Sequence, residues 1–262
     1  MPRISSIPSL GTCPGFAVLR ASGADDGGSK AADTGSAVGR VIQLWHQGGE
    51  GAGALEEAMQ RAVREAPEAF PQADLDEART WALMYAADPR NRGVVLPDSC
   101  EQEVRLALPA APEDPTGAPV EFVGHMDQVR RVQGQLRVWD LKSGKGGGLE
   151  LLYTHAWQLA AYALAATEAY NQPVLPGGVI RLRGYTAKTS PPEANAHFDA
   201  PWSLEACRTM LATAVQHVAW LRLGLIHLQP GIHCQWCPGG GPANCGERID
   251  RVREMPRALV GG

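Results

Sequence analysis

Apolar residues in the first third of the chain recur at helical spacing. Residues 36–46, 53–66 and 74–87 each place apolar side chains three or four positions apart, which predicts three amphipathic helices. Asp74 precedes the third of these stretches and fits the N-cap position. The Gly-, Asp-, Ser- and Ala-rich stretch 23–35 predicts a loop before the first helix.

The middle of the chain changes to alternation of apolar and polar residues. Residues 101–108, 120–129 and 136–142 follow this period of two, which predicts three antiparallel strands. The remaining predicted elements are a helix at 149–170, a strand at 178–185, a loop at 191–201, a helix at 203–225 with Ser203 at its N-cap, and a Gly-, Pro- and Cys-rich loop at 229–246. We therefore expect one mixed α/β domain over residues 1–262, with a central mixed sheet flanked by helices. Its core would span about 95–190 and its helical additions about 36–90.

Composition is typical of a soluble globular protein. The chain has 262 residues, 44% of them hydrophobic and 20% charged. No apolar run approaches the roughly 20 residues that span a bilayer. The N-terminus has no apolar stretch of the kind found in secretory signals. We expect a cytoplasmic protein, in a bacterium or a phage-infected host, with no membrane partner.

The net charge of −4 hides a local excess of positive charge. Between residues 128 and 145 there are five basic residues and one acid, Asp140. Such a cluster predicts a polyanionic partner near this segment. The candidate DNA-contacting residues are Arg130, Arg131, Lys145, Arg181 and Arg183. The alternative is that these side chains are solvated at strand edges.

Two carboxylates and a lysine stand out within this basic region. Asp127 precedes Asp140 by thirteen residues, and Lys142 follows Asp140 at i+2. On a strand, residues 140 and 142 point to the same face, and a hairpin would bring Asp127 close to Asp140. Carboxylates are the ligands that Mg²⁺ or Mn²⁺ prefers, and an adjacent ammonium can orient water or hold a phosphate. The pattern predicts metal-assisted phosphodiester cleavage.

The six cysteines do not follow the spacing of a secreted disulfide framework. Cys100 and Cys207 stand alone and are predicted to be buried thiols. The other four are Cys13, Cys234, Cys237 and Cys245. In a reducing compartment this set predicts an iron–sulfur or zinc site that joins the two ends of the chain.

Three motifs together resemble one nuclease family. Gly124-His-Met-Asp127, Asp140-Leu-Lys142 and Gln158-x₃-Tyr162 resemble motifs of the RecB-like branch of the PD-(D/E)XK nucleases. The predicted order of elements also matches that family's restriction-endonuclease-like core. The cysteines resemble those that hold a 4Fe–4S cluster in CRISPR-associated RecB-like exonucleases and in the nuclease domains of AddAB-type helicases.

The resemblance implies a role for each residue of the central motifs. Asp127 and Asp140 would bind Mg²⁺ or Mn²⁺ together with the backbone carbonyl of Leu141. Lys142 would orient the attacking water or stabilise the phosphate.

The resemblance also implies roles for residues on the neighbouring elements. Glu103 on the first strand would be the upstream acidic residue, with Glu101 on the same strand face as the alternative. Gln158 and Tyr162, one helical turn apart, would lie beside the DNA backbone. The alternative for this pair is ordinary packing on a helix surface.

One departure from the family concerns a histidine. The family carries Gly-x-x-x-His on the helix before the sheet, and here the matching stretch ends at Gly39. His46 lies two turns further along the helix, roughly 10 Å away. His125 lies on the same strand face as Asp127 and could supply a nitrogen; the alternative is a hydrogen-bonded surface histidine.

Two functions from different classes follow. The first is a metal-dependent deoxyribonuclease, an exonuclease on single-stranded or end-frayed DNA that works with a metal-activated water. The second is a non-catalytic or weakly active DNA-binding component of a repair or recombination complex, because the histidine is replaced by Gly39. Besides DNA, the candidate partners are a helicase and recombination or phage proteins. The sequence contains no helicase signature of its own.

Overall fold

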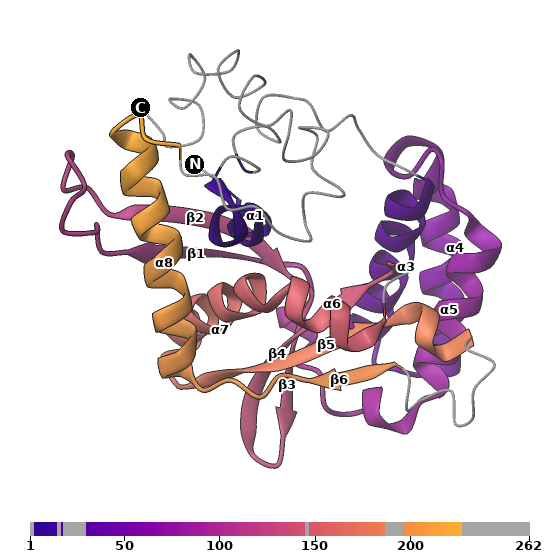
Figure 1. The fold of residues 1–262 in the computed structure, drawn as a ribbon. Coiled ribbons are helices and arrows are strands. Elements are labelled where there is room, and N and C mark those ends of the chain that lie inside the picture. The colour runs from indigo at the N-terminus through magenta and orange to yellow at the C-terminus, as the bar shows by residue number, and fades with distance from the viewer. Residues whose placement is uncertain (1–2, 15–16, 18–29, 145–146, 187–195, 227–262) are drawn as a thin grey trace.

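The computed structural model describes residues 3–14, 17, 30–144, 147–186 and 196–226. It contains the mixed α/β arrangement that the residue pattern predicts, with the elements in the expected order (Figure 1). The differences from the prediction fall where chain segments distant in sequence contact one another.

Three helices form the helical part of the structure. They are α3 (Lys30–Gln47), α4 (Ala52–Ala69) and α5 (Leu75–Ala87). Asp74 caps α5 as predicted, since its Oδ1 accepts a hydrogen bond from Glu77 N at 3.1 Å. The loop predicted over 23–35 is wrong for residues 30–35, which form the first turns of α3. Thr34 Oγ1 accepts a bond from Asp74 N at 2.8 Å, and Lys30 pairs with Asp74 at 2.9 Å, so contacts with α5 stabilise this turn.

The strands form two small sheets. The first pairs β1 (Gln102–Leu108) with β2 (Val120–Met126) in antiparallel fashion. The second has the order β3-β4-β5-β6 and is mixed, because only the β4–β5 pair is parallel. Its strands are β3 (Gln128–Val132), β4 (Gln135–Lys142), β5 (Val174–Arg181) and β6 (His197–Asp199).

The strand predicted over 120–129 breaks at Asp127. Before Asp127 the chain pairs with β1, and after it the chain pairs with β4. The backbone carbonyl of Asp127 accepts a hydrogen bond from Glu101 N at 3.3 Å, and its side chain accepts one from Leu141 N. Asp127 therefore sits at the point where the chain passes from one sheet to the other.

The helix predicted over 149–170 is two helices. They are α6 (Gly148–Thr154) and α7 (Ala156–Tyr170), and His155 lies between them with φ −101° and ψ 10°. The strand predicted at 178–185 begins earlier, at Val174, and gives way after Arg181 to a 3₁₀ helix, η5 (Leu182–Thr186). The short strand β6 falls within the predicted loop 191–201.

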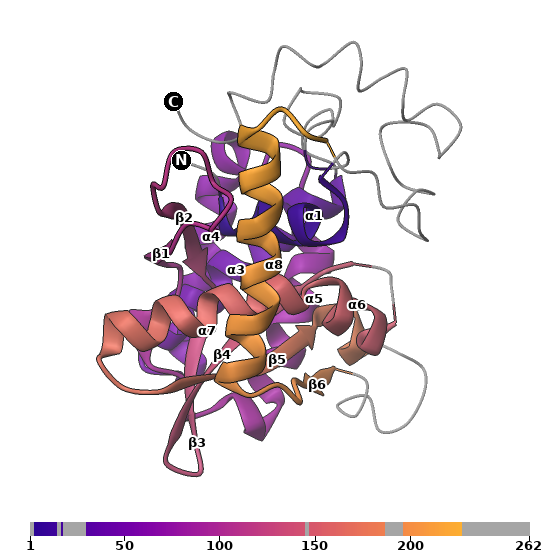
Figure 2. The same ribbon diagram turned by 60° about the vertical axis from the view of Figure 1, so that its left-hand side comes forward.

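Each face of the four-stranded sheet is covered by helices. Leu136 and Val138 on β4 and Val179 on β5 pack into a core with α7 and α8 (Leu204–Arg222). Trp139 and Ile180 belong to a second core with α3, α4 and α5. Figure 1 shows the α3–α5 group at one end of the molecule, and α8 crosses α7 in both Figure 1 and Figure 2. The helix α7 is buried around most of its circumference, which explains its nearly continuous apolar sequence.

The beginning of the described chain packs against its last helix. A 3₁₀ turn, η1 (Ile4–Ser6), leads into α1 (Ile7–Thr12), which lies against α8. The contact includes a hydrogen bond between His217 Nδ1 on α8 and the carbonyl of Leu10 at 2.6 Å. Ser203 caps α8 as predicted. Among the described residues, no helix has the combination of length and apolar character that would cross a membrane.

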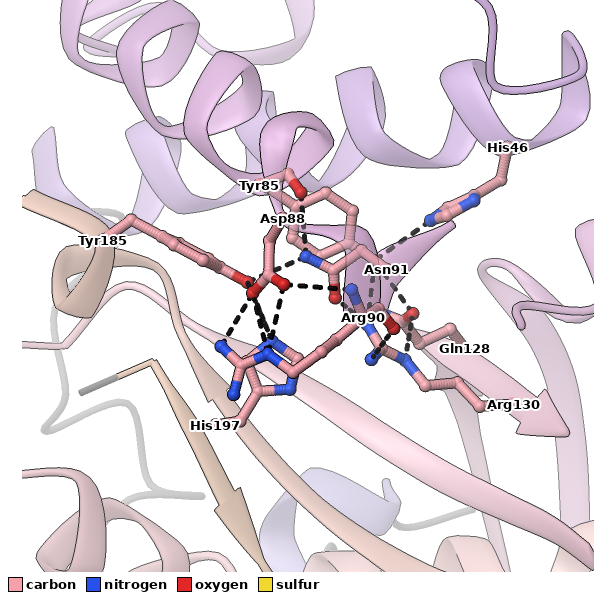
Figure 3. Close-up of polar contacts among 9 residues, drawn as sticks. All are labelled: His46, Tyr85, Asp88, Arg90, Asn91, Gln128, Arg130, Tyr185 and His197. Atoms are coloured by element: carbon pink, nitrogen blue, oxygen red, sulfur yellow. Dashed lines mark hydrogen bonds and ion pairs between the residues drawn. The ribbon is translucent and has the colours of Figure 1, made fainter. Parts of the chain in front are cut away.

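A buried polar network joins the helical part to the sheet (Figure 3). At its centre the guanidinium of Arg130 on β3 donates to Gln128 Oε1 at 3.0 Å, Tyr85 Oη at 3.0 Å and Asn91 Oδ1 at 2.7 Å. Arg130 is 2% exposed, and its guanidinium carbon lies 5.1 Å from the Trp139 ring centroid.

The same network continues towards β6 and η5. Asp88 Oδ2 lies 2.7 Å from Arg90 Nη2, with which it forms an ion pair, and 3.3 Å from His197 Nε2. It also accepts a hydrogen bond from Tyr185 Oη at 3.2 Å. Burial, followed by the positive charges of Arg130 and Arg90, lowers the pKa of His197 to about 3. His197 is therefore neutral at physiological pH and serves as a hydrogen-bonding partner.

Candidate active site

One cleft of about 780 Å³ brings the central motifs together. Its floor comes from the region where β2 and β4 meet, and its walls come from α3 and from α6 and α7. The predicted site residues that line it are Asp127, Asp140, Leu141, Lys142, Glu103, Gln158 and Tyr162, together with the alternatives Glu101 and His125.

The two aspartates lie near each other at the end of the β3–β4 pair, where the charge of Asp140 acts on Asp127. The paired register ends at Gln128 and Trp139, and Asp127 and Asp140 are the residues next to this last pair. Asp140 is 1% exposed, whereas Asp127 is partly accessible from the cleft. The hydrogen bond from Leu141 N fixes one oxygen of the Asp127 carboxylate. The β3–β4 hairpin therefore brings Asp127 near Asp140, as expected from the sequence.

Lys142 projects from the same face of β4 as Asp140. Its Nζ lies 2.6 Å from Asp140 Oδ2, and its side chain is 20% exposed. Burial alone would lower the pKa of Lys142, but the negative charges of Asp140 and Asp127 outweigh it and raise the pKa. Lys142 is therefore an ammonium at neutral pH, suited to holding negative charge and not to accepting a proton.

Negative charge is in excess at the centre of the cleft. Burial, and then the charges of Asp140 and Glu101, raise the pKa of Asp127 well above its ordinary value, although Lys142 opposes this. A divalent cation would relieve the repulsion, and Asp127 must be ionised to bind it. Cation binding is therefore expected to strengthen as the pH rises through the raised pKa of Asp127.

The two upstream glutamates differ in their surroundings. Glu103 pairs with Arg105 at 3.3 Å, and its side chain is 51% exposed. Glu101 lies just before β1, where desolvation of its carboxyl against the cleft raises its pKa and the charge of Asp140 adds to the effect, while His125 opposes it. Both line the cleft, and the charge of Asp140 contributes to the raised pKa of Glu101.

The third motif lies on the first turns of α7. Gln158 and Tyr162 line the cleft, and Gln158 Nε2 donates to Tyr162 Oη at 3.4 Å. Gly124 on β2 makes room for Tyr162, because a Cβ at Gly124 would lie 3.1 Å from the tyrosine ring and 2.9 Å from Ile4 Cβ. Burial, and then the charge of Asp127, raises the pKa of Tyr162, so its hydroxyl keeps its proton.

His155 is a cleft residue that sequence reasoning missed. It lies at the break between α6 and α7 and lines the cleft, with Nδ1 3.1 Å from Gln158 Oε1. Burial, and then the positive charge of Lys142, lowers the pKa of His155 to about 4. Its position three residues before Gln158 was the available signal, but the uninterrupted helical pattern concealed the break.

The place of the family's histidine is open on α3. An ideal Cβ at Gly39 would meet only Glu101 Oε1, at 3.9 Å, within 4 Å. His46 does not reach this region, because it is buried in the network of Figure 3 and contacts Tyr85.

The predicted DNA-contacting residues lie in different surroundings. The prediction for Arg130 is wrong, because its guanidinium is enclosed and bonded to neutral partners from α5 and the following turn. Arg131 is exposed on β3. Arg183 donates to the carbonyl of Ser143 at 2.9 Å and supports the chain that follows Lys142. Arg181 on β5 is the backbone register partner of Lys142 on β4. Lys145 lies outside the described residues.

Only one of the four clasp cysteines can be placed. Cys13 is buried at the end of α1, beside α8. Cys234, Cys237 and Cys245 lie outside the described residues. Cys100 and Cys207 are confirmed as buried free thiols.

The residues of the cleft suit a hard divalent cation. Asp127 and Asp140 offer carboxylate oxygens, and burial, followed by the charge of Asp140, raises the pKa of Asp127 even though Lys142 opposes this. Within the described residues, no group of three or more His, Cys, Asp and Glu side chains is arranged as a preformed metal site. The donor chemistry fits Mg²⁺ or Mn²⁺, with the two aspartates as the first ligands.

The comparisons agree with this geometry. A family model of the PD-(D/E)XK nuclease superfamily matches residues 4–239, which include the whole cleft except Arg3. A comparison with curated proteins gives no match. The resemblance is confirmed for the superfamily, while the RecB-like branch and the iron–sulfur site remain predictions. The chain belongs to the PD-(D/E)XK nuclease superfamily.

Proposed function

We propose that the protein is a metal-dependent deoxyribonuclease of the RecB-like type that digests single-stranded or end-frayed DNA from an end. The observation that carries the proposal is the meeting of Asp127, Asp140 and Lys142 in one cleft of a chain that belongs to a nuclease superfamily. The chemistry is hydrolysis of a phosphodiester without a covalent intermediate.

Asp127 and Asp140 hold the divalent cation in this proposal, helped by the backbone carbonyl of Leu141. When bound, Mg²⁺ or Mn²⁺ supplies Lewis-acid polarisation of the phosphate and a water of lowered pKa. The hydrogen bond from Leu141 N keeps the Asp127 carboxylate oriented towards Asp140.

Lys142 places a fixed positive charge where negative charge develops on the phosphate. The oxygen of water forms a bond to phosphorus as the bond to the leaving sugar oxygen breaks. The attacking water gives up one proton to solvent, and the leaving oxygen takes up one proton from solvent. Gln158 and Tyr162 donate hydrogen bonds to the backbone of the bound strand, and His155 holds Gln158 in position through their 3.1 Å contact.

The size of the cleft is compatible with part of a single strand. A volume of about 780 Å³ is in the range of a small-molecule pocket and is large enough for one or two nucleotides. Residues with small side chains or none on α3 form one wall: Ala32, Gly35, Ser36 and Gly39. The turn that contains Arg3 borders the cleft, and Arg3 forms a β-bridge with Val123.

The test is digestion of end-labelled single-stranded and blunt double-stranded DNA by anaerobically purified protein. We expect loss of the labelled single strand in Mg²⁺ or Mn²⁺, no loss in EDTA, and much slower loss of the blunt duplex. A circular single strand of the same length is the matched control for end dependence. Equal digestion of the circle would contradict the exonuclease assignment while leaving the nuclease assignment in place.

A second function is favoured by one specific observation, the absence of an imidazole at Gly39. In that case the protein is a DNA-binding component of a repair or recombination complex with little or no cleavage. It would then bind DNA with a steep salt dependence and show no cleavage with any divalent metal. The digestion assay above separates the two functions directly.

We also propose an iron–sulfur clasp formed by Cys13, Cys234, Cys237 and Cys245. The supporting observation is that Cys13 follows α1, which packs on α8, and α8 is the last described helix before the segment that carries the other three cysteines. A cluster bound in this way would stabilise the contact between the two ends of the chain. A cluster-bearing nuclease of this kind belongs in the reducing cytoplasm, with a helicase or recombination proteins as partners for unwinding.

The clasp predicts that the anaerobically purified protein is brown and contains about four iron atoms per chain. Cys13→Ser is expected to lose the iron and to unfold at a lower temperature, because a ligand of the cluster is removed. Cys207→Ser, at a buried thiol with no role in the clasp, is the matched control and is expected to keep the iron. Colourless protein with stoichiometric zinc would contradict the cluster and support the zinc alternative.

A further inference from the structure

We propose that Glu101 takes the place of the missing imidazole and becomes the third side-chain ligand when the metal binds, giving a centre with oxygen ligands only. The described carboxylates do not form a preformed three-ligand group, so binding of the cation would draw Glu101 towards Asp127 and Asp140. The inference rests on the proposed nuclease function, because it concerns the cation that this function requires. It assigns to Glu101 the role that the sequence had suggested for Glu103.

Glu101 lies beside the position from which the family's histidine would extend. The family's histidine would extend from residue 39 of α3, and an ideal Cβ there lies 3.9 Å from Glu101 Oε1. No other atom approaches that Cβ within 4 Å, apart from the helix's own backbone and the neighbouring residues of the chain. The carboxylate of Glu101 therefore lies beside the space that an imidazole at residue 39 would enter, in the same cleft as Asp127 and Asp140.

The backbone at Glu101 has an uncommon conformation. Its φ is +56°, in the left-handed region that side chains other than glycine rarely adopt. Its N–H donates to the carbonyl of Asp127 at 3.3 Å, which ties it directly to the residue between the two sheets. A strained residue bonded to a proposed ligand is the pattern expected when a side chain must reach a particular place.

Hydrogen bonds from α3 and from β3 support the turn that carries Glu101. Gln43, one helical turn after Gly39 on α3, donates to the carbonyl of Cys100 at 3.2 Å. Ser99 Oγ accepts a hydrogen bond from Val129 N at 2.7 Å, which anchors the turn to β3. The helix face that carries Gly39 and the turn that carries Glu101 are thereby held together.

Asp140 and Glu103 differ in how the cleft holds them. Asp140 is 1% exposed, and its Oδ2 lies 2.6 Å from Lys142 Nζ, so its carboxylate is held inside the cleft. Glu103 is not positioned in the same way, because it is half exposed and paired with Arg105. In the β1–β2 register its partner is His125, which is exposed.

An all-oxygen centre has a consequence for metal preference. Carboxylates favour Mg²⁺ and Mn²⁺, whereas an imidazole increases the affinity for Co²⁺ and Ni²⁺. The wild-type protein is therefore expected to bind Mn²⁺ with little gain on changing to Co²⁺. Gly39→His combined with Glu101→Gln restores the nitrogen ligand and is expected to shift the preference towards Co²⁺.

The experiment is calorimetric titration of the full-length, anaerobically purified protein with Mn²⁺ and with Co²⁺, without DNA. Glu101→Gln is expected to weaken Mn²⁺ binding about tenfold or more. Glu103→Gln, the matched control two residues away, is expected to bind as the wild type does. If Glu101→Gln does not fold, judged by its circular dichroism, Glu101→Asp takes its place, with the same expected direction.

The Mn²⁺ affinities of the two glutamate variants decide whether Glu101 is a ligand. Unchanged Mn²⁺ affinity in the Glu101 variant, or an equal loss in the Glu103 variant, would overturn it. If Asp127→Asn still abolishes binding in that case, the proposed function stands and only the role of Glu101 is lost. If the wild-type protein binds neither metal, the proposed function and the inference fail together.

Discussion

Replacing Lys142 with methionine is expected to slow cleavage of single-stranded DNA by about 10²–10³-fold. The ammonium lies 2.6 Å from Asp140 Oδ2 in a cleft with an excess of carboxylates, and it carries the charge that would stabilise the phosphate during hydrolysis. Methionine keeps the length and the apolar stem of the side chain but removes that charge. The measurement is the initial rate of loss of an end-labelled strand at saturating Mn²⁺.

The control for this variant is Lys30→Met. Lys30 is an exposed lysine that pairs with Asp74 and does not line the cleft. It is expected to cleave at the wild-type rate. A Lys142→Met protein that is folded and cleaves as fast as Lys30→Met would exclude Lys142 from the reaction.

Replacing Arg130 with methionine is expected to lower the free energy of unfolding by about 2–4 kcal/mol. The guanidinium satisfies Gln128, Tyr85 and Asn91 at the junction of β3 with the helical part (Figure 3). Methionine fills most of the volume but leaves Asn91 Oδ1 without the Arg130 donor, and leaves Gln128 Oε1 with only the hydrogen bond from Tyr85 Oη. The measurement is urea unfolding followed by circular dichroism, at equal ionic strength for all proteins.

The control here is the neighbouring residue on the same strand. Arg131 is exposed, and Arg131→Met is expected to change the free energy of unfolding by less than about 0.5 kcal/mol. Equal stability of the two variants would show that the network does not hold the helical part to the sheet. Weaker DNA binding by Arg130→Met without loss of stability would restore its predicted role as a DNA contact.

The central motif could be predicted because its geometry is local. Asp140 and Lys142 share a strand face through the period of two, and a hairpin register brings Asp127 to Asp140. The caps at Asp74 and Ser203 depend on the first turn of their own helices, and both were predicted. Superfamily membership follows from the same local spacings.

The remaining features depend on contacts between distant segments. Charge counting placed Arg130 on the surface because arginine is usually exposed. Its burial needs partners from residues 85 and 91, some forty positions away. The break at His155 is hidden because the apolar pattern runs on through it, and the strand switch at Asp127 shows only when both partner strands are in place.

The choice between Glu101 and Glu103 has the same origin. Both residues fit one face of a regular strand, so spacing could not separate them. The positive φ of Glu101 and the contact of its turn with α3 separate them in the structure.

The most direct test of the central claim compares the wild-type protein with Asp127→Asn on an end-labelled single strand in Mn²⁺. Asparagine can keep the hydrogen bond from Leu141 N while removing the charge that would bind the cation. We expect the wild type to shorten the strand, EDTA to stop it, and the folded variant to leave the strand intact. Equal rates of cleavage by the two proteins would contradict the assignment of this cleft as the active site.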